Sequence, residues 1–371
     1  MNKNYSLLQV SAFRLMRHHL TGKRDANLVK VAGDVCGVQA QVINSAYTFF
    51  WSRMKDISKN EISSALYENR WLVRTMLMRQ TVHIILSGDF FIYLNAVKNR
   101  NIDAMMRIMS PFGIKQKDVD KLNLRIVDAL ADGPLSKSEL SKVIYSSSNK
   151  NMKEWMDLVG NTFKSAIFEG LVCYAQIKGN EAFFVRVDQW LPHLVQYPEE
   201  KAKQLLFKMY FRAYGPATLH DFSKWSGNLL KESERIMELV KDEFNEINYN
   251  GKKGFILTED FTEFNFVKFK KDSLHILPGF DSYILGHAKK DHLIKLKDYK
   301  KVYRNQGWIS PVILLDGEII GTWSHRKSSK RYLIDIHLFE KLPNRIINKI
   351  EKEMAGLESF WECPCEINFN L

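Results

Sequence analysis

The sequence predicts a mainly helical α+β protein in which tandem winged helix-turn-helix units pack with an N-terminal helical region into one body. Three observations support this fold class. Apolar residues recur at helical spacing through the first hundred residues. The order helix, turn, helix, then two strand-like runs occurs twice in the middle of the chain. From residue 275 onward, short runs alternate apolar and polar residues with the period of two that half-buried strands show.

The N-terminal region is expected to be helical up to about residue 100. Apolar residues such as Leu28, Val31 and Ala32 stand three or four residues apart, which places them on one face of a helix. Ser58 is followed three residues later by Glu61. This spacing is a capping-box signal and predicts a helix that begins next to Ser58.

The first repeat of the helix-turn-helix order begins in the stretch LADGPLSKSELSKVIY. A turn at Gly133-Pro134 precedes Ser136, which has Glu139 at the capping-box position. An apolar helix then stops near Gly170, and two strand-like runs are joined by Lys178-Gly179-Asn180.

The second repeat shows the same order with little sequence identity. Gly215-Pro216 takes the place of the earlier Gly-Pro turn, Thr218 caps the next helix and Gly227 ends it. A helix over 229–245 and a further pair of strand-like runs complete this segment.

The C-terminal segment is expected to contain three antiparallel strands within residues 311–339. Asp316-Gly317 is a strong two-residue hairpin turn, and Ser328-Ser329 lies at the second bend. A last helix is expected at about 343–358. These boundaries divide the chain into four expected segments: 1–117, 118–198, 199–270 and 271–371.

The charge balance favours a polyanionic partner. The 371 residues carry a formal net charge of +12, and the sequence pI is about 9.3. The second hairpin bend is especially basic, and its charges suit a duplex groove or its phosphates. The alternative for the chain is a general surplus of surface lysine, and for the bend a solvated turn whose charges prevent edge pairing. The candidate DNA contacts at this bend are His325, Arg326, Lys327, Lys330 and Arg331.

A second candidate contact is the stretch VRTMLMRQTVH, where Arg74 and Arg79 interrupt an apolar run and His83 follows. On a helix, Arg79 and His83 would share a face. An arginine in such a place needs an anion, which is either an internal carboxylate or a DNA phosphate. His83 alone is more typical of a structural histidine than of a catalyst.

Several classes of protein and site are disfavoured. The N-terminus is too polar for a secretory signal, and no uncharged apolar run approaches the roughly 18 residues of a membrane span. The four cysteines suggest no disulfide framework, so we expect a reducing cytoplasm, in association with the nucleoid. Cys363-Pro364-Cys365 lacks a second Cys/His pair at suitable spacing, and we expect no metal.

Five motifs occur in one order along the chain: GVQAQ, LVRTMLMRQTVH, RAYGPATLHDFSKWSG, LPGFDSYILGH and DGEIIGTWSHR. Together they resemble the AlkZ/YcaQ-type winged-helix DNA glycosylases, over almost the whole chain. The resemblance implies a monofunctional glycosylase without a cofactor. Such an enzyme removes N-alkylated purines from duplex DNA, including bulky adducts and, in some members, interstrand crosslinks. It also implies that a β-hairpin of the last winged-helix unit engages DNA, and the bend at 325–331 is the candidate.

The resemblance also assigns the catalytic residues. The family's motif is Gln, an apolar residue, then Gln or Asp, and Gln39-Ala40-Gln41 matches it in the Gln-x-Gln form of the AlkZ-like branch. In a helix, residues i and i+2 lie about 200° apart, but in an extended segment they share a face. Gly37 permits an irregular backbone just before them. We therefore expect the motif at a helix end or break; the alternative is that both glutamines only buttress neighbouring helices.

The chemistry of the lesion explains why glutamines suffice. An alkyl group on purine N7 or N3 leaves the base positively charged and already a good leaving group. The enzyme then has to stabilise an oxocarbenium-like sugar and to aim one water at the anomeric carbon. A glutamine carbonyl can accept a hydrogen bond from that water, and its amide donates two more.

Two other functions compete with this one. A winged-helix transcription regulator would need a sequence-reading helix and paired half-sites matched to a dimer. A DNA-structure-binding protein would bind without catalysis. A glycosylase should instead act as a monomer, with little sequence preference, on duplex DNA that contains alkylated purines.

Overall fold

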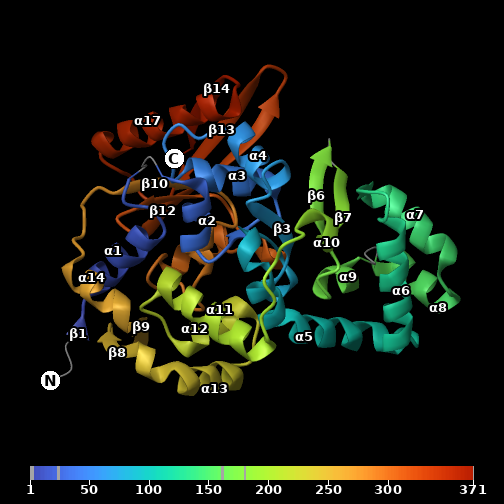
Figure 1. Cartoon of the computed structure of the whole chain (residues 1–371). Helices are drawn as coiled ribbons and strands as arrows, with labels where there is room; N and C mark the ends of the chain where they lie inside the picture. Colours follow the sequence, from blue (N-terminus) through green and yellow to red (C-terminus); the bar gives the residue numbers. More distant parts are fainter. Residues whose placement is uncertain (1–3, 23–25, 160–162, 179–180, 371) are drawn as a thin grey trace. The chain divides into compact units, whose positions relative to one another are not determined.

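A computed structural model describes residues 4–22, 26–159, 163–178 and 181–370 of the chain (Figure 1). The fold is α+β and mainly helical, as predicted. Its residues form two compact units, which group the four expected segments differently. The first unit contains Met1–Ser63, Phe207–Trp225 and Leu229–Leu371, and the second contains Ser64–Leu206 and Ser226–Asn228. Within the described residues, we find no helix with the length and apolar character that crossing a membrane requires.

Three of the N-terminal helices, α1, α2 and α4, begin at side-chain caps. The Ser6 hydroxyl accepts a hydrogen bond from the Gln9 amide at 3.2 Å where α1 begins. Ser58 and Glu61 form the expected capping box before α4. The elements are β1 (Asn4–Tyr5), α1 (Leu7–Arg17), α2 (Leu28–Asp34), β2 (Val38–Gln39), α3 (Ile43–Trp51) and α4 (Lys59–Tyr67).

The helical prediction for the first hundred residues is wrong between residues 72 and 86. There β3 (Leu72–Met76) and β4 (Val82–Leu86) form an antiparallel hairpin around the 3-10 turn η1 (Met78–Gln80). Every residue of β3 is buried, so the strand has no polar face and its sequence cannot be told from a buried helix. Arg79 therefore lies in the turn and His83 in β4, and they share no helix face.

The second unit continues with the long helix α5 (Phe90–Met109) and the first helix-turn-helix segment. β5 lies between α6 and α7 and pairs antiparallel with β7, which also pairs with β6; both of these strands follow α9. Ser136 and Glu139 form the predicted capping box of α7. Gly179 and Asn180 of the expected hairpin turn lie outside the described residues. The elements are η2 (Ser87–Asp89), η3 (Ser110–Phe112), α6 (Gln116–Ala129), β5 (Leu135–Ser136), α7 (Lys137–Ser147), α8 (Lys150–Val159), α9 (Lys164–Phe168), β6 (Val172–Lys178), β7 (Glu181–Arg186) and α10 (Val187–Trp190).

The second helix-turn-helix segment follows the same order and its later part belongs to the first unit. A bridge between Ala217 and Phe255 takes the place of the short strand. Thr218 and Asp221 form a reciprocal cap at the start of α12, and Gly227 follows that helix with a φ of +84°. The helix expected over 229–245 is shorter. The elements are α11 (Glu199–Tyr214), α12 (Leu219–Ser226), α13 (Leu230–Val240), η4 (Lys241–Glu243), β8 (Phe244–Tyr249) and β9 (Lys252–Leu257).

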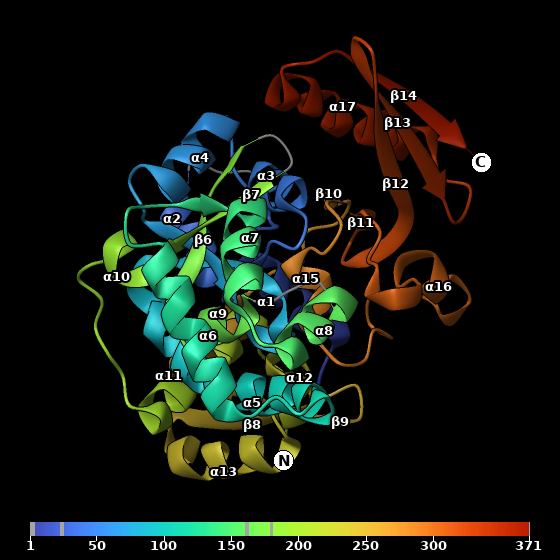
Figure 2. The ribbon, with the colours of Figure 1, turned by 90° about the vertical axis from the view of Figure 1, so that its right-hand side faces the viewer.

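The C-terminal residues form a five-stranded sheet in the order β10-β11-β12-β13-β14, with α17 packed along it (Figures 1 and 2). The predicted turn at Asp316-Gly317 is confirmed, with φ of +54° and +86°. Ser328 pairs with Arg331, so the second bend lies one residue later than expected. The elements are η5 (Thr258–Asp260), α14 (Phe261–Phe266), β10 (Leu274–Leu277), α15 (Ser282–Leu285), η6 (Leu296–Asp298), α16 (Tyr299–Val302), η7 (Asn305–Gly307), β11 (Val312–Leu315), β12 (Glu318–Ser328), β13 (Arg331–Leu338), α17 (Asn344–Trp361) and β14 (Cys365–Asn370).

Helix α1 holds the first unit together because it contributes to two hydrophobic cores. Val10 and Phe13 pack against β8, β9 and α14. Leu15 packs in the other core, among residues of β10, α15 and β11. The polar residues of α1 that lie between these positions, Arg14 included, are thereby fixed inside the unit.

Candidate active site

The glutamine motif lies between α2 and α3, in a segment without helical structure. After α2, Cys36 and Gly37 adopt positive φ angles of 55° and 91° and turn the chain into β2. Gln39 is the last residue of β2 and is 9% exposed, whereas Gln41 is exposed in the bend before α3. The expectation that the motif sits at a helix break is confirmed.

The turn that leads into the motif is held by two side chains from distant parts of the first unit. The Tyr214 hydroxyl donates to the Val35 carbonyl at 3.2 Å, and the Ser282 hydroxyl donates to the Gly37 carbonyl at 3.1 Å. These carbonyls flank Cys36, whose positive φ is unfavourable for a residue with a Cβ. Both bonds are buried, and each is expected to stabilise this backbone conformation by about 1 kcal/mol.

Ser282 is positioned by a buried ion pair. Arg53 donates to both carboxylate oxygens of Asp281, at 2.9 and 2.8 Å, and both side chains are fully buried. Asp281 also caps α15 by accepting from the Tyr283 amide. Arg53 further donates to the His18 carbonyl at 2.9 Å. This bidentate geometry satisfies both charges and links α1, α3 and α15 beneath the motif.

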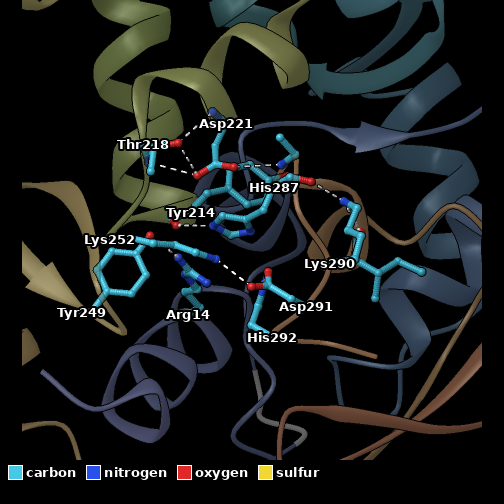
Figure 3. Close-up of polar contacts among 12 residues, drawn as sticks. Arg14, Tyr214, Thr218, Asp221, Tyr249, Lys252, His287, Lys290, Asp291 and His292 are labelled. Carbon is cyan, nitrogen blue, oxygen red and sulfur yellow. Dashed lines mark hydrogen bonds and ion pairs between the residues drawn. The ribbon is translucent and has the colours of Figure 1, made fainter. Parts of the chain in front are cut away.

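His287, which follows α15, donates a hydrogen bond with a structural role. Its Nε2 contacts the Tyr214 carbonyl at 3.0 Å, which assigns the proton to Nε2 (Figure 3). Burial lowers the pKa of His287 well below its ordinary value, so the ring is neutral at physiological pH. The Tyr214 carbonyl therefore accepts a hydrogen bond from His287, while the Tyr214 hydroxyl donates one to the Val35 carbonyl. The motif LPGFDSYILGH contains Asp281, Ser282 and His287, but the sequence alone predicted no role for them.

Arg74, Arg79 and His83 lie in the second unit. Arg74 is 7% exposed, and its guanidinium stacks over the Tyr174 ring at 4.5 Å. Arg79 is partly buried in the β3–β4 turn. His83 is 2% exposed and contacts the Thr81 carbonyl at 2.9 Å through Nδ1. Burial, with a smaller contribution from Arg79, lowers the pKa of His83 to about 3. A neutral interior imidazole brings neither charge nor surface to a phosphate.

The basic tip, defined as residues 324–331 of the β12–β13 hairpin, is exposed at every position. Arg331 pairs with Glu366 at 2.7 Å, and Arg326 lies 3.9 Å from Asp335. Surface pairs of this kind are weak and leave the cations available to a phosphate. His325 differs, because its ring packs against Trp361 at 4.8 Å, and the partial desolvation of the ring lowers its pKa. The tip therefore offers four cations and an aromatic contact at its root.

No group of three or more His, Cys, Asp or Glu side chains among the described residues is arranged to hold a metal ion. Cys365 is a protonated thiol, because burial raises its pKa to about 11.

Comparisons with known proteins agree with this description. The sequence profile of the family described as DNA glycosylase AlkZ-like matches residues 32–360. An interstrand DNA cross-link repair glycosylase of Streptomyces sahachiroi is 27% identical over 378 aligned residues, covering 97% of this chain and 98% of that protein. The solved structure of the Streptomyces sahachiroi DNA glycosylase AlkZ superposes with a TM-score of 0.84 at 25% identity. That match covers 98% of this chain and all of the solved one.

Proposed function

The chain belongs to the AlkZ-like DNA glycosylases, and from this premise we propose that it removes N-alkylated, cationic purines from duplex DNA, including those in interstrand crosslinks. As a DNA glycosylase it is a hydrolase of the N-glycosidic bond. The similar protein from Streptomyces sahachiroi is named for cross-link repair. We propose the same kind of lesion here, handled by a monomer in the compartment that contains the DNA.

The observation that carries the proposal is the non-helical segment that holds the motif, a strand at Val38–Gln39 followed by a bend at Gln41, on a buried, hydrogen-bonded support. Because the segment is not helical, the side chains of Gln39 and Gln41 are not held about 200° apart, and we propose that both reach one water. Two carboxamides on one side can hold one water, with a carbonyl as acceptor and an amide as donor. The support fixes where that water stands relative to the sugar.

The proposed reaction needs no strong acid, because the alkylated base leaves as a neutral molecule once the C1′–N bond breaks. The water held by Gln39 and Gln41 adds to C1′ and loses a proton to solvent. Holding the water in this orientation lowers the activation barrier by several kcal/mol. A neutral purine is a much poorer leaving group, so undamaged DNA should survive.

Contacts with the DNA backbone are proposed for two places. Arg326, Lys327, Lys330 and Arg331 of the basic tip are exposed cations suited to phosphates. Arg74 and Arg79 of the second unit are proposed as further contacts. His83 is left out of this set because it is buried and neutral.

The test is an excision assay on a duplex with one N7-methylguanine, scored by alkaline cleavage of the resulting abasic site. The proposal expects cleavage at the lesion and none in an undamaged duplex. A duplex crosslinked through N7 alkylation, resolved on a denaturing gel, tests unhooking. The matched control is the Gln39→Ala/Gln41→Ala protein, which should bind both substrates without converting them. No product from either lesion would overturn the proposal.

A further inference from the structure

A cavity of about 320 Å³ lies in the first unit, where α1, the start of α12, the β8–β9 turn and the loop after α15 meet (Figure 3). Neither the glutamine motif nor the basic tip lines it. His220 and Lys289 in its lining are exposed, whereas Arg14 and His287 are buried. A solute that enters from the solvent therefore meets a buried cation.

Arg14 is 2% exposed, and no carboxylate of the described residues pairs with it. One Nη donates to the Pro216 carbonyl, and the same atom lies 3.4 Å from the Tyr249 hydroxyl. Its Nε is buried and has no hydrogen-bond partner among the described residues. A buried charge without a counter-ion is costly, and an unsatisfied buried donor indicates a missing ligand, ion or water.

Two other arginines of the first unit show what is missing at Arg14. Arg53 is fully buried and has Asp281 as a bidentate partner. Arg17, one turn after Arg14 on α1, pairs with Asp260 and Glu263. Only Arg14, of these three, faces a cavity without a carboxylate partner.

The carboxylates that line the cavity are already engaged. Asp221 accepts from the Thr218 amide and hydroxyl, at 2.9 and 2.8 Å, and from the Ala288 amide at 2.8 Å. Asp291 pairs with Lys252 at 2.7 Å. A hydrogen bond from His292, together with Lys252, holds the pKa of Asp291 well below its usual range. Asp291 thus compensates Lys252 and leaves Arg14 to an external anion.

We propose that this cavity, the Arg14 cavity, binds a phosphate group, with Arg14 as the buried donor and Lys289 as the cation at its rim. Arginine offers a planar set of donors that matches phosphate oxygens, and its free Nε supplies one of them. Resting on the proposed function, we assign the DNA backbone as the source of the phosphate.

The connection to the glutamine motif favours this source. His287 lines the cavity and donates to the Tyr214 carbonyl, and the Tyr214 hydroxyl in turn holds the Val35 carbonyl. Tyr214 therefore joins His287, in the cavity wall, to the turn before Gln39. A phosphate bound here would fix the DNA backbone relative to the residues that hold the water.

The experiment measures the melting temperature of the full chain in sodium phosphate against sodium chloride at equal ionic strength. We expect phosphate to raise the Tm by about 2 °C, and Arg14→Met to abolish this rise. Arg17→Met is the matched control on the same helix; it loses an ion pair and should keep the phosphate-dependent rise. Replacing a buried, unpaired charge by a residue of similar length is compatible with folding.

A second arm measures duplex affinity as a function of salt. If the source is DNA, Arg14→Met lowers the slope of log K against log salt by about 0.9, one phosphate contact. Loss of the phosphate-dependent Tm rise with an unchanged slope supports the cavity but identifies a free phosphate compound as its ligand. Should Arg14→Met not fold, Lys289→Gln replaces it and is expected to reduce the rise.

The proposal is overturned if phosphate does not raise the Tm of the wild type, if the rise persists in Arg14→Met, or if Lys289→Gln leaves the rise undiminished. The Tm arm requires no glycosylase activity. A protein that fails to excise any lesion can still show the phosphate effect, so the two proposals fail separately.

Discussion

The turn before Gln39 and the basic tip of the β12–β13 hairpin are both short loops, but they are built in opposite ways. The turn is buried, and its carbonyls are held by Tyr214 and Ser282. The basic tip is exposed throughout and has only surface ion pairs. The difference shows that one part of the chain fixes the backbone before the glutamine motif, whereas another part supplies exposed positive charge. Effects at the turn should be insensitive to salt, and effects at the tip should depend on it.

The largest expected effect is on the support of the turn. Asp281→Ala leaves the fully buried Arg53 without its partner. The free energy of unfolding should fall by about 3–5 kcal/mol, measured by urea denaturation. A double variant, Arg53→Met/Asp281→Leu, removes both charges and should recover much of the loss. A change below about 1 kcal/mol for Asp281→Ala would mean that the pair does not stabilise the region.

Removal of the glutamine side chains should come next in size. Gln39→Ala or Gln41→Ala is expected to slow single-turnover excision of N7-methylguanine by roughly 10²–10³-fold, as for the loss of a positioned polar group at a reacting centre. Affinity for the lesion-bearing duplex should be unchanged. If affinity and rate fell together, the two residues would instead be structural.

The basic tip should affect affinity through charge. Replacing Arg326, Lys327, Lys330 and Arg331 by Gln is expected to lower the slope of log K against log salt by up to about 3.6, since each phosphate contact contributes about 0.9. Unfolding should be nearly unaffected, because all four are exposed. The exposed Lys341 and Lys352, replaced by Gln, control for a general loss of charge. An unchanged slope would exclude the tip as a phosphate contact.

Burial of histidine predicts how stability depends on pH. The pKa of His83 is about 3 in the folded chain and close to the ordinary 6.5 when unfolded. The unfolded state therefore binds the proton first, and stability falls as pH drops from 6.5 toward 3, by about 1.4 kcal/mol per pH unit for this residue. His83→Gln should make the fall shallower by that amount, measured by denaturation at pH 5 to 7. His193→Gln, at an exposed position of the same unit, should leave it unchanged.

The smallest expected effect tests one hydrogen bond under the turn. Ser282→Ala removes the donor to the Gly37 carbonyl and should cost about 1 kcal/mol of stability. Excision should slow several-fold without loss of duplex affinity, because the backbone before Gln39 is less restrained. Ser233→Ala removes a comparable buried hydroxyl from α13 and should not change excision. Equal loss of excision in both variants would contradict a positioning role for Ser282.

Local signals in the sequence predicted local structure well. The capping boxes at Ser58 and Ser136, the helix cap at Thr218 and the two-residue turn at Asp316-Gly317 all appear in the structure. These features depend on contacts over two or three residues, so a short stretch of sequence contains all the information. The β3–β4 hairpin was missed because its strands are buried on both faces and lack the period of two.

The sequence by itself determined the class of fold, the helix starts at Ser58, Ser136 and Thr218, the non-helical glutamine motif and the excess of positive charge. Only the tertiary structure decided what burial does to each charged or polar residue. Arg53 meets Asp281 across 228 positions of the chain, while Arg14, buried on α1, has no carboxylate partner among the described residues. His83 becomes neutral because β4 is enclosed. The physical reason is that the free energy of a charge depends on its surroundings, which residues far apart in the sequence create on folding.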